Sequence, residues 1–362
     1  MENMVEDGNF WAGRRVFLTG HTGFKGSWLC IWLHSLGAEL YGYALKPPTE
    51  PSLFCMAGVR KLMTASTEND IRDLAALRSA LVSAQPEVVF HMAAQPLVRD
   101  SYKDPVETYS INVMGTVNLF EALRSCPSVR AVASVTTDKV YENMEWVWGY
   151  RETDRLGGHD PYSNSKACTE LVTAAFRSSY FNEKDYPKHG VAIATARAGN
   201  VIGGGDWAAE RLVPDCVRAF TSHQKVKIRY PNSIRPWQHV LDALNGYMIL
   251  AKSLAEAGTR FSGAWNFSPE NRDARSVSWV VQTAAALWGG DAQYSIGTDE
   301  NPHEAGLLML DHSKARQLLG WKPRWNIEKA LEKTVGWFKF SERGTNAFEI
   351  CRSQITSFEA GE

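Results

Sequence analysis

A short β-branched run that leads directly into a glycine-rich turn constrains this chain more than any other feature of its sequence. Residues 15–18 read Arg-Val-Phe-Leu and are followed by Thr19-Gly20-His21-Thr22-Gly23-Phe24-Lys25-Gly26 and an apolar helical segment. Glycines at a helix start let a phosphate approach the backbone N–H groups, which side chains would block. Gly20, Gly23 and Gly26 therefore predict a dinucleotide site at the first crossover of a parallel sheet. A plain strand-to-helix turn is the competing interpretation.

Short β-branched runs alternate with longer helical segments from residue 14 to about residue 202. This alternation is typical of a parallel sheet covered by helices. The predicted strands are Arg15–Leu18, Leu40–Ala44, Lys61–Ala65, Val88–His91, Ala131–Val135 and Val191–Ala196. The predicted helices are Trp28–Leu36, Leu74–Ala84, Val106–Arg124 and Ser163–Phe181. We therefore expect an α/β fold with a doubly wound, Rossmann-like parallel sheet.

The regular alternation ends after Gly205, where loops rich in proline, tryptophan and arginine begin. Further on, Gln238–Leu254 has an amphipathic helical pattern and Ala264–Phe267 reads as a strand, so the chain is expected to return briefly to the first domain. We predict a dinucleotide-binding Rossmann domain at residues 1–203 and about 238–268. A smaller, mostly C-terminal α/β substrate domain is predicted at about 204–237 and 269–362.

The charge balance and the cysteines exclude several classes of protein. A formal net charge of -1 gives no general attraction to nucleic acid or anionic lipid, so a small-molecule partner must be held by a local site. The six cysteines include no CxxC pair and the start of the chain lacks a secretory pattern, so a cytoplasmic location is expected. No apolar stretch reaches the roughly 20 residues of a membrane span, and no HExxH or HxH arrangement suggests a metal site.

The segment Pro161-Tyr162-Ser163-Asn164-Ser165-Lys166 opens a predicted helix with Tyr162 and Lys166 on one face. A phenol with a pKa near ~10 is a poor base at neutral pH. An ammonium, an oxidised nicotinamide and the positive end of a helix all favour the phenolate. Tyr162 is therefore expected to take a hydroxyl proton while hydride leaves the same carbon. The competing interpretation is an aromatic residue with a nearby solvated lysine, which the position after the fifth strand disfavours.

Further motifs follow the predicted strands at regular places. They are His91-Met92-Ala93-Ala94-Gln95, Asn112-Val113 with Gly115-Thr116, Asn200-Val201-Ile202-Gly203, and Leu310-Asp311-His312-Ser313-Lys314-Ala315 with Leu319-Gly320-Trp321. With the glycine turn and the tyrosine–lysine pair they resemble the extended short-chain dehydrogenase/reductase family over roughly residues 14–340. The resemblance implies an NAD cofactor held by Gly20, Thr22, Gly23, Phe24, Lys25, Gly26, Asp70, Ile71, Ala93, Ala94, Gln95, Tyr162 and Lys166.

One expected element of an NAD site is missing. An Asp or Glu about twenty residues after the glycine turn normally binds the ribose hydroxyls, but the second predicted strand ends Tyr43-Ala44-Leu45-Lys46. Lys46 would even suit a 2′-phosphate, so NAD rather than NADP does not follow from this segment. Asp70-Ile71 resembles the pair that contacts adenine in the family, although Asp70 is equally well placed by residue type to cap the next helix.

The fifth predicted strand runs into Thr136-Thr137-Asp138-Lys139-Val140-Tyr141. This segment resembles the Thr-Asp-Glu of the nucleotide-sugar dehydratases within the family, and Thr-Asp-Lys resembles their CDP-glucose branch. The resemblance implies that Thr137, Asp138, Lys139, Tyr162 and Lys166 are catalytic, with Asp138 as acid and Lys139 as base. A lysine base requires a pKa well below ~10.4, which Lys166, the nicotinamide and partial burial are expected to provide. The alternative is a strand end whose Asp and Lys are merely solvated.

Arginines in the irregular region suit a nucleotide diphosphate, because a guanidinium engages phosphate oxygens bidentately. Arg211 and Arg235 are the candidates, with a structural interfacial role as the alternative for each. The resemblance adds Arg99, Asn200 and His239 to the expected substrate-binding residues. It implies CDP-glucose as substrate, although nothing in the residues themselves identifies the base.

Other functions remain open at this stage. They are a dehydratase or epimerase of another nucleotide sugar, and a dinucleotide-sensing regulator without turnover. The resemblance also implies a homodimer or homotetramer paired through helices Val106–Arg124 and Ser163–Phe181, and a place in deoxysugar biosynthesis for O-antigen or other lipopolysaccharide.

Overall fold

The computed structural model describes residues 10–290, 292–297 and 306–362. Its centre is a seven-stranded sheet in the order β11-β6-β5-β4-β1-β2-β3, and every neighbouring pair of strands is parallel. These strands are β1 (Arg15–Thr19), β2 (Glu39–Ala44), β3 (Ala65–Glu68), β4 (Val88–His91), β5 (Ala131–Val135), β6 (Ala192–Ala198) and β11 (Gly263–Phe267). The strand order reverses between β1 and β4, so the predicted doubly wound α/β fold is confirmed.

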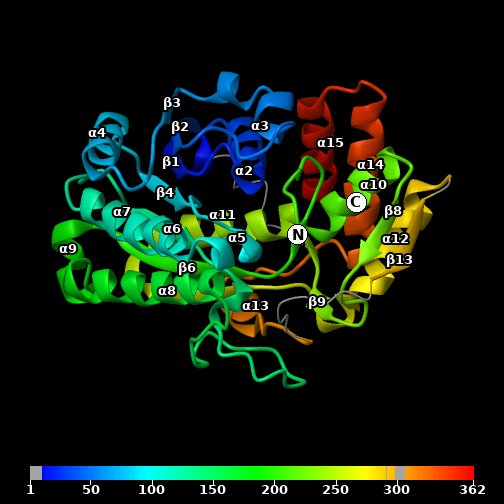
Figure 1. Ribbon diagram of the computed structural model, residues 1–362. Helices are drawn as coiled ribbons and strands as arrows, with labels where there is room; N and C mark the ends of the chain where they lie inside the picture. Colours follow the sequence, from blue (N-terminus) through cyan, green and yellow to red (C-terminus); the bar gives the residue numbers. More distant parts are fainter. Residues whose placement is uncertain (1–9, 291, 298–305) are drawn as a thin grey trace.

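Helices cover both faces of this sheet (Figure 1). Along β1, Val16 and Leu18 belong to a core with α2 (Phe24–Ser35) and α11 (Val240–Ala257). Phe17 points the other way, into a core with helices α4 (Leu74–Ala84) and α7 (Gly115–Leu123). Burial on both faces explains why the strands read as near-continuous apolar runs.

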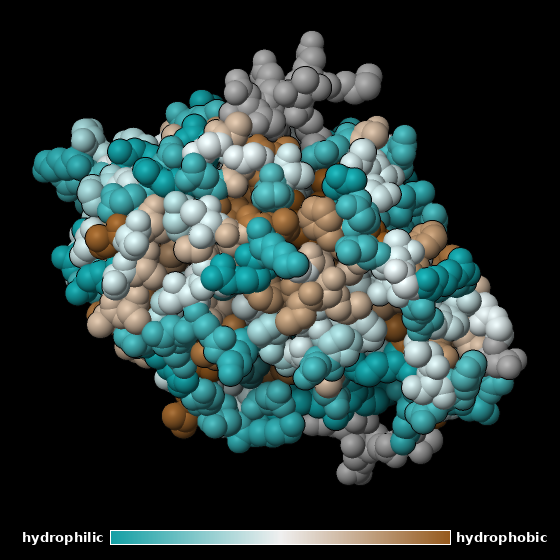
Figure 2. Space-filling view, turned by 90° about the horizontal axis from the view of Figure 1, so that it is seen from above, coloured by the Kyte–Doolittle hydropathy of each residue, from teal (hydrophilic) through white to brown (hydrophobic). Residues whose placement is uncertain are grey.

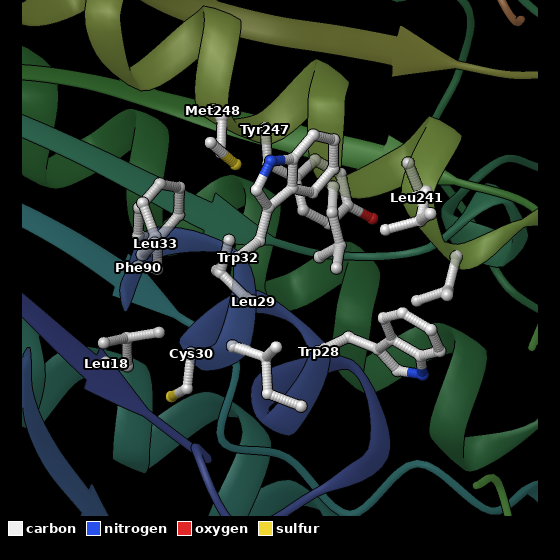
Figure 3. Packing of buried hydrophobic residues seen from close by; sticks show 14 of the residues in the cluster. Leu18, Trp28, Leu29, Cys30, Trp32, Leu33, Phe90, Leu241, Tyr247 and Met248 are labelled. Carbon is white, nitrogen blue, oxygen red and sulfur yellow. The ribbon is translucent and has the colours of Figure 1, made fainter. Parts of the chain in front are cut away.

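The larger of these two cores lies between α2 and α11. Trp28 and Trp32 of α2 are buried there together with Tyr247 and Met248 of α11 (Figure 3). The C-terminal helix α15 (Ala347–Ala360) closes the same core, because the rings of Trp32 and Phe358 meet edge to face at 5.6 Å. The chain end therefore packs against the first crossover helix.

A second region stands at the other end of the molecule from α4 and α7 (Figure 1). It contains the parallel pair β8 (Lys225–Ile228) and β13 (Gln293–Ile296) and the antiparallel pair β9 (Ile234–Pro236) and β12 (Ala274–Ser276). A separate apolar core joins α10 (Leu212–Thr221), α12 (Val277–Trp288) and α14 (Ile327–Glu342). The remaining elements are β7 (Val201–Ile202), β10 (Gln238–His239), α3 (Leu53–Met56), α5 (Val98–Lys103), α6 (Pro105–Tyr109), α8 (Pro161–Ser179), α9 (Tyr186–His189) and α13 (Ser313–Leu318).

The predicted strand at Lys61–Ala65 is wrong. Val59–Leu62 forms a 3₁₀ turn, and β3 begins only at Ala65. The apolar residues before β3 anchor this turn, with Met63 buried in the core, whereas β3 itself contains no buried residue. An edge strand that buries no side chain shows little alternation of apolar and polar residues. The apolar turn before it therefore resembles a strand more than β3 does.

Two predicted helices differ from the observed ones near the site. The helix predicted over Val106–Arg124 is α6 and α7 joined by a π-helical turn at Ser110–Met114. The helix predicted over Gln238–Leu254 begins two residues later, because Gln238–His239 pairs with Val201–Ile202 as a strand. The strand predicted at Ala264–Phe267 is confirmed as β11, which returns the chain to the main sheet beside β6.

Polar side chains are spread over the face of the molecule seen in Figure 2, with apolar ones among them. No helix in the described ranges is both long enough and apolar enough to cross a membrane.

Candidate functional site

The three glycines of the first turn have different physical roles. A Cβ on Gly20, whose φ is +76°, would lie 2.7 Å from the backbone nitrogen of Ala93, and a Cβ on Gly26 would collide with the carbonyl oxygen of Gly20. These two glycines allow close backbone packing, contrary to the prediction that all three open the site. Gly23 alone leaves room, since its nearest neighbour would be the Gly20 oxygen at 3.4 Å. It begins α2 without a side-chain cap, which leaves the first N–H groups for an anion, so the turn fits the diphosphate of a dinucleotide.

The two acids at the end of β3 have separate tasks. Asp73 caps α4 by accepting from the Ala76 N–H, so the alternative of Asp70 as the cap is wrong. The Asp70 carboxylate instead accepts bonds from the Arg72 guanidinium, and these bonds lower the pKa of Asp70. Ile71 is buried against Gly115. Asp70 and Ile71 are thus held in place by separate contacts, and their role toward adenine stays a prediction.

The end of β2 carries no carboxylate that could bind a ribose. Lys46 faces Glu68 at 3.8 Å, and both side chains are largely exposed. Thr22 of the glycine turn donates to the Leu45 carbonyl oxygen and so fixes the turn against this strand end.

The loop after β4 is tied to the helix that carries Tyr162. Asn112, in the π-helical turn, accepts from the Gln95 N–H and donates to the Gln95 oxygen and to Ser165 Oγ. Ser165 Oγ in turn donates to the Tyr162 carbonyl oxygen. The π-turn therefore directs one amide at both the Ala93–Gln95 loop and the start of α8, a use typical of π-turns at functional sites.

Tyr162 and Lys166 lie in the first turns of α8, which Asp160 caps. Lys166 is buried, and its Nζ donates to the Val135 carbonyl oxygen at 3.2 Å. Burial lowers the pKa of Lys166 to about 8, while the charge of Glu170 opposes this shift. Burial raises the pKa of Tyr162 to about 12, although the Thr137 hydrogen bond and the Arg211 charge act in the other direction. Within the protein atoms, desolvation therefore outweighs the nearby cations, and the predicted phenolate depends on the oxidised nicotinamide that the prediction includes.

Asp138 is buried directly after β5, with 2% of its surface exposed. Its Oδ1 accepts from Thr137 Oγ1 at 3.0 Å, and its Oδ2 has no partner among the described residues. Burial raises the pKa of this carboxyl, against the charges of Lys139, Arg235 and Lys25. A carboxyl that keeps its proton to higher pH suits a general acid. Lys139 is partly buried next to it.

Lys25 and Arg211 complete a central cluster with Asp138, Tyr162 and Lys166. Burial lowers the pKa of Lys25 to about 8, and Arg211 and Lys166 contribute in the same direction. Arg211 Nη1 donates to Asp206 Oδ2 at 2.9 Å, and its charge also acts on Tyr162. The central cluster therefore gathers three cations, a phenol and a carboxyl from four separate segments of the chain. The sequence had assigned Lys25 only to the cofactor.

The other predicted substrate residues differ in their contacts. Arg235 is buried, donates to the Ile234 carbonyl oxygen and acts electrostatically on Asp138. Arg99 pairs with Glu210 at 3.3 Å. Asn200 is partly buried, and its carbonyl oxygen accepts from the Gln238 N–H.

His239 is not brought to the central cluster. It is fully buried, caps α11, and packs edge-on against Trp28 and Trp325. Burial lowers its pKa to about 3, so the ring is neutral. Among the described residues the ring packs on the two tryptophans, and the substrate-binding role of His239 stays a prediction.

A buried ion pair between Glu170 and Arg197, whose carboxylate acts on Lys166, was not predicted from the sequence. The Arg197 guanidinium on β6 donates to both carboxylate oxygens of Glu170, at 3.0 and 2.8 Å. Thr136 and Thr195 also donate to that carboxylate. An arginine inside an apolar strand was the available signal, because such a charge requires a partner.

Replacing Glu170 with glutamine is expected to destabilise the fold by about 3–5 kcal/mol, because it leaves a buried guanidinium uncompensated. Urea unfolding followed by circular dichroism measures this loss. The control is Glu349→Gln, which removes an exposed carboxylate 2.8 Å from Arg352 and should cost less than about 1 kcal/mol. Equal losses of unfolding free energy in the two variants would show that the buried ion pair stabilises the fold no more than an exposed one.

Comparisons with known proteins show the family and the fold of this chain. The family model described as GDP-mannose 4,6 dehydratase matches residues 17–334. A CDP-glucose 4,6-dehydratase from Salmonella typhimurium is 52% identical over 97% of this chain and 98% of its own length. Among solved structures, a dTDP-glucose 4,6-dehydratase from Bacillus anthracis has a TM-score of 0.75 at 20% identity, covering 91% of this chain and 98% of its own. A UDP-glucose-4-epimerase from Stenotrophomonas maltophila has a TM-score of 0.79 at 20% identity, over 92% and 100% of the two chains. The predicted resemblance is confirmed.

Proposed function

The chain belongs to the GDP-mannose 4,6 dehydratase family, and on this premise we propose that it catalyses the NAD-dependent 4,6-dehydration of CDP-D-glucose. The product is CDP-4-keto-6-deoxy-D-glucose, with release of water. The substrate is suggested by the near full-length similarity to the Salmonella enzyme and by Thr-Asp-Lys after β5.

The observation that carries the proposal is the buried carboxyl of Asp138 beside the phenol of Tyr162. A 4-epimerase needs one base at C4, whereas dehydration also needs an acid for the C6 hydroxyl. Asp138 has the burial and the raised pKa that such an acid requires, and Thr137 links it to Tyr162 through hydrogen bonds.

NAD, when bound, supplies a hydride acceptor for C4 and later a hydride donor for C6. Tyr162 takes the proton of the C4 hydroxyl, and the ketone that forms at C4 acidifies the hydrogen at C5. A base then removes the C5 proton while Asp138 gives its proton to the departing C6 oxygen. Lys166 lies one turn beyond Tyr162 in α8. Its amine is held in place by a hydrogen bond to the Val135 carbonyl oxygen.

Lys139 is proposed as the C5 base, in the position that a glutamate holds in related dehydratases. Lys139→Ala is then expected to slow water loss about 10²–10⁴-fold and to leave C4 oxidation intact. Rapid-quench analysis of the sugar separates the two steps. An unchanged rate of water elimination would remove Lys139 from the mechanism and leave the role of Asp138 standing.

The cofactor is proposed to lie along the carboxyl ends of the strands. Its diphosphate would meet Gly23 and the first N–H groups of α2, in the turn that Thr22 and Phe24 flank, with Gly20 and Gly26 supporting the backbone. Asp70 and Ile71 would hold the adenine, and Ala93, Ala94 and Gln95 would line the path to Tyr162 and Lys166. Lys25 is the remaining residue proposed to bind the cofactor.

On the substrate side we propose that Arg211 and Arg235 bind the diphosphate, and that Arg99 and Asn200 border it. The role of His239 remains an expectation from resemblance. The Rossmann domain is proposed to comprise residues 1–203 and about 238–268, and the substrate domain about 204–237 and 269–362. Helix α15 packs on α2, so the last helix of the chain contacts the proposed Rossmann domain.

A homodimer or homotetramer is proposed through α6–α7 and α8. Val106, Met114 and Leu171 on these helices are exposed apolar residues, which favours an interface there. We further propose a cytoplasmic enzyme of deoxysugar biosynthesis that supplies O-antigen or other lipopolysaccharide.

Incubation of the purified chain with CDP-, dTDP-, UDP- and GDP-hexoses tests the proposal. Mass spectrometry is expected to show loss of water from CDP-glucose, and the cofactor released from the same preparation is expected to be NAD. A C4 epimer as product would favour the epimerase. NAD binding without turnover of any of the sugars would favour a sensor.

A further inference from the structure

Lys25 occupies an electrostatically unfavourable place. It lies in the first turn of α2, where the helix dipole is positive, and that turn contains no acidic residue. The charges of Arg211 and Lys166 act on it as well. Within the described ranges, Lys25 forms no ion pair with a carboxylate. A buried cation in such a place is stabilised by a carboxylate that forms near it.

The carboxyl of Asp138 is the group that fits this description. The helix that carries Lys25 follows β1, Asp138 follows β5, and only β4 separates these strands in the sheet, so both residues stand at its carboxyl edge. Lys25 and Asp138 each influence the ionisation of the other. Asp138 Oδ2 is buried and has no partner in the described part of the chain.

Tyr247 limits where the ammonium of Lys25 lies. Its ring centroid is 6.0 Å from Lys25 Nζ, and it extends from α11 in the core next to α2 (Figure 3). The buried Tyr247 hydroxyl, which has no partner among the described residues, also senses the charge of Asp138. The ammonium therefore lies near an aromatic ring whose hydroxyl is itself within electrostatic reach of Asp138.

We propose that Lys25 is a positioning residue for the acid Asp138, because its ammonium stabilises the carboxylate that remains after proton transfer. The inference rests on the proposed dehydration. When the C6–O bond breaks, its electron pair stays with oxygen, which takes the Asp138 proton and leaves as water. The buried Asp138 carboxylate then faces the Lys25 ammonium until it regains a proton from solvent, in exchange for the one removed from C5.

Replacing Lys25 with methionine is expected to lower kcat for dehydration about 10–100-fold, since Asp138 becomes a weaker acid. Loss of a neighbouring cation raises the pKa of a carboxyl. Activity is lost as pH rises through the pKa of an essential acid, so the alkaline limb of the kcat profile should move to higher pH. Lys25→Arg retains the charge and should return the limb toward its original position. The control, Lys61→Met, removes an exposed lysine and should change neither quantity.

A second measurement does not depend on turnover. The Asp138 carboxyl is titrated by carbon NMR in the chain labelled at aspartate, with the signal assigned through Asp138→Asn. The pKa of Asp138 should be higher in Lys25→Met than in the natural chain. An unchanged titration, or a kcat limb that stays in place, overturns the proposal. A raised Asp138 pKa in a chain that converts no CDP-glucose would instead refute the proposed function and leave the coupling between Lys25 and Asp138 established.

Discussion

Replacing Tyr162 with phenylalanine is expected to lower the rate of C4 oxidation about 10²–10⁴-fold, because the phenol is the only base proposed for the C4 hydroxyl. The loss should appear in the first half-reaction, so bound cofactor is not reduced when CDP-glucose is added. Stopped-flow absorbance of the reduced nicotinamide measures this directly.

The fold should survive this substitution. Tyr162 contributes its backbone to the Ser101 hydrogen bond at the start of α8, and phenylalanine keeps that bond and most of the ring volume. The thermal midpoint of Tyr162→Phe is therefore expected to match that of the natural chain. A variant that still reduces its cofactor at the original rate would show that another group takes the C4 proton.

Replacing Asp138 with asparagine is expected to block the second half of the reaction and spare the first. An amide has the shape of the carboxyl but no proton of comparable acidity, so water loss should fall about 10²–10⁴-fold while C4 oxidation continues. Reduced cofactor should then accumulate together with a 4-keto hexose that still carries its C6 hydroxyl.

Exchange at C5 provides the internal control for Asp138→Asn. If the base remains intact, deuterium from the solvent should enter C5 of the stalled ketone. A variant that releases the deoxysugar at an undiminished rate would show that Asp138 is not the acid. A variant that also fails to reduce its cofactor would show that Asp138 acts before elimination.

The sequence predicted the fold well where burial imposes a period. The strands Val88–His91 and Ala131–Val135 and the helix Leu74–Ala84 are found with the predicted bounds. In these segments, packing on both faces or along one face dictates residue type. The strand at β3 was misplaced because an edge strand with exposed side chains leaves its position to hydrogen bonds that residue type does not report.

The identities of the site residues were easier to predict than their environments. The motifs selected Tyr162, Lys166 and Asp138, which the structure brings together. Motifs do not report desolvation, however, and within the protein atoms burial raises the pKa of Tyr162. The surroundings of His239 could not be predicted for a related reason, since its position near Arg235 in the sequence says nothing of the two tryptophan rings that pack against it.

Long-range partners were the remaining gap. Glu170 and Arg197 are 27 positions apart and meet only because α8 packs on β6. Lys25 stands in the glycine turn, and nothing local links it to Asp138 on another strand. The Glu170–Arg197 pair and the proximity of Lys25 to Asp138 both depend on the order of the strands. The sequence predicted a doubly wound sheet but not that order.

The most direct test of the account follows one hydrogen atom. CDP-glucose carrying deuterium at C4 is converted in ordinary water, and the product is examined by NMR. If Tyr162, Asp138 and one bound nicotinamide act on the same hexose, the deuterium that leaves C4 should be recovered at C6. Deuterium that remains at C4 of a hexose with its C6 hydroxyl intact would contradict the account.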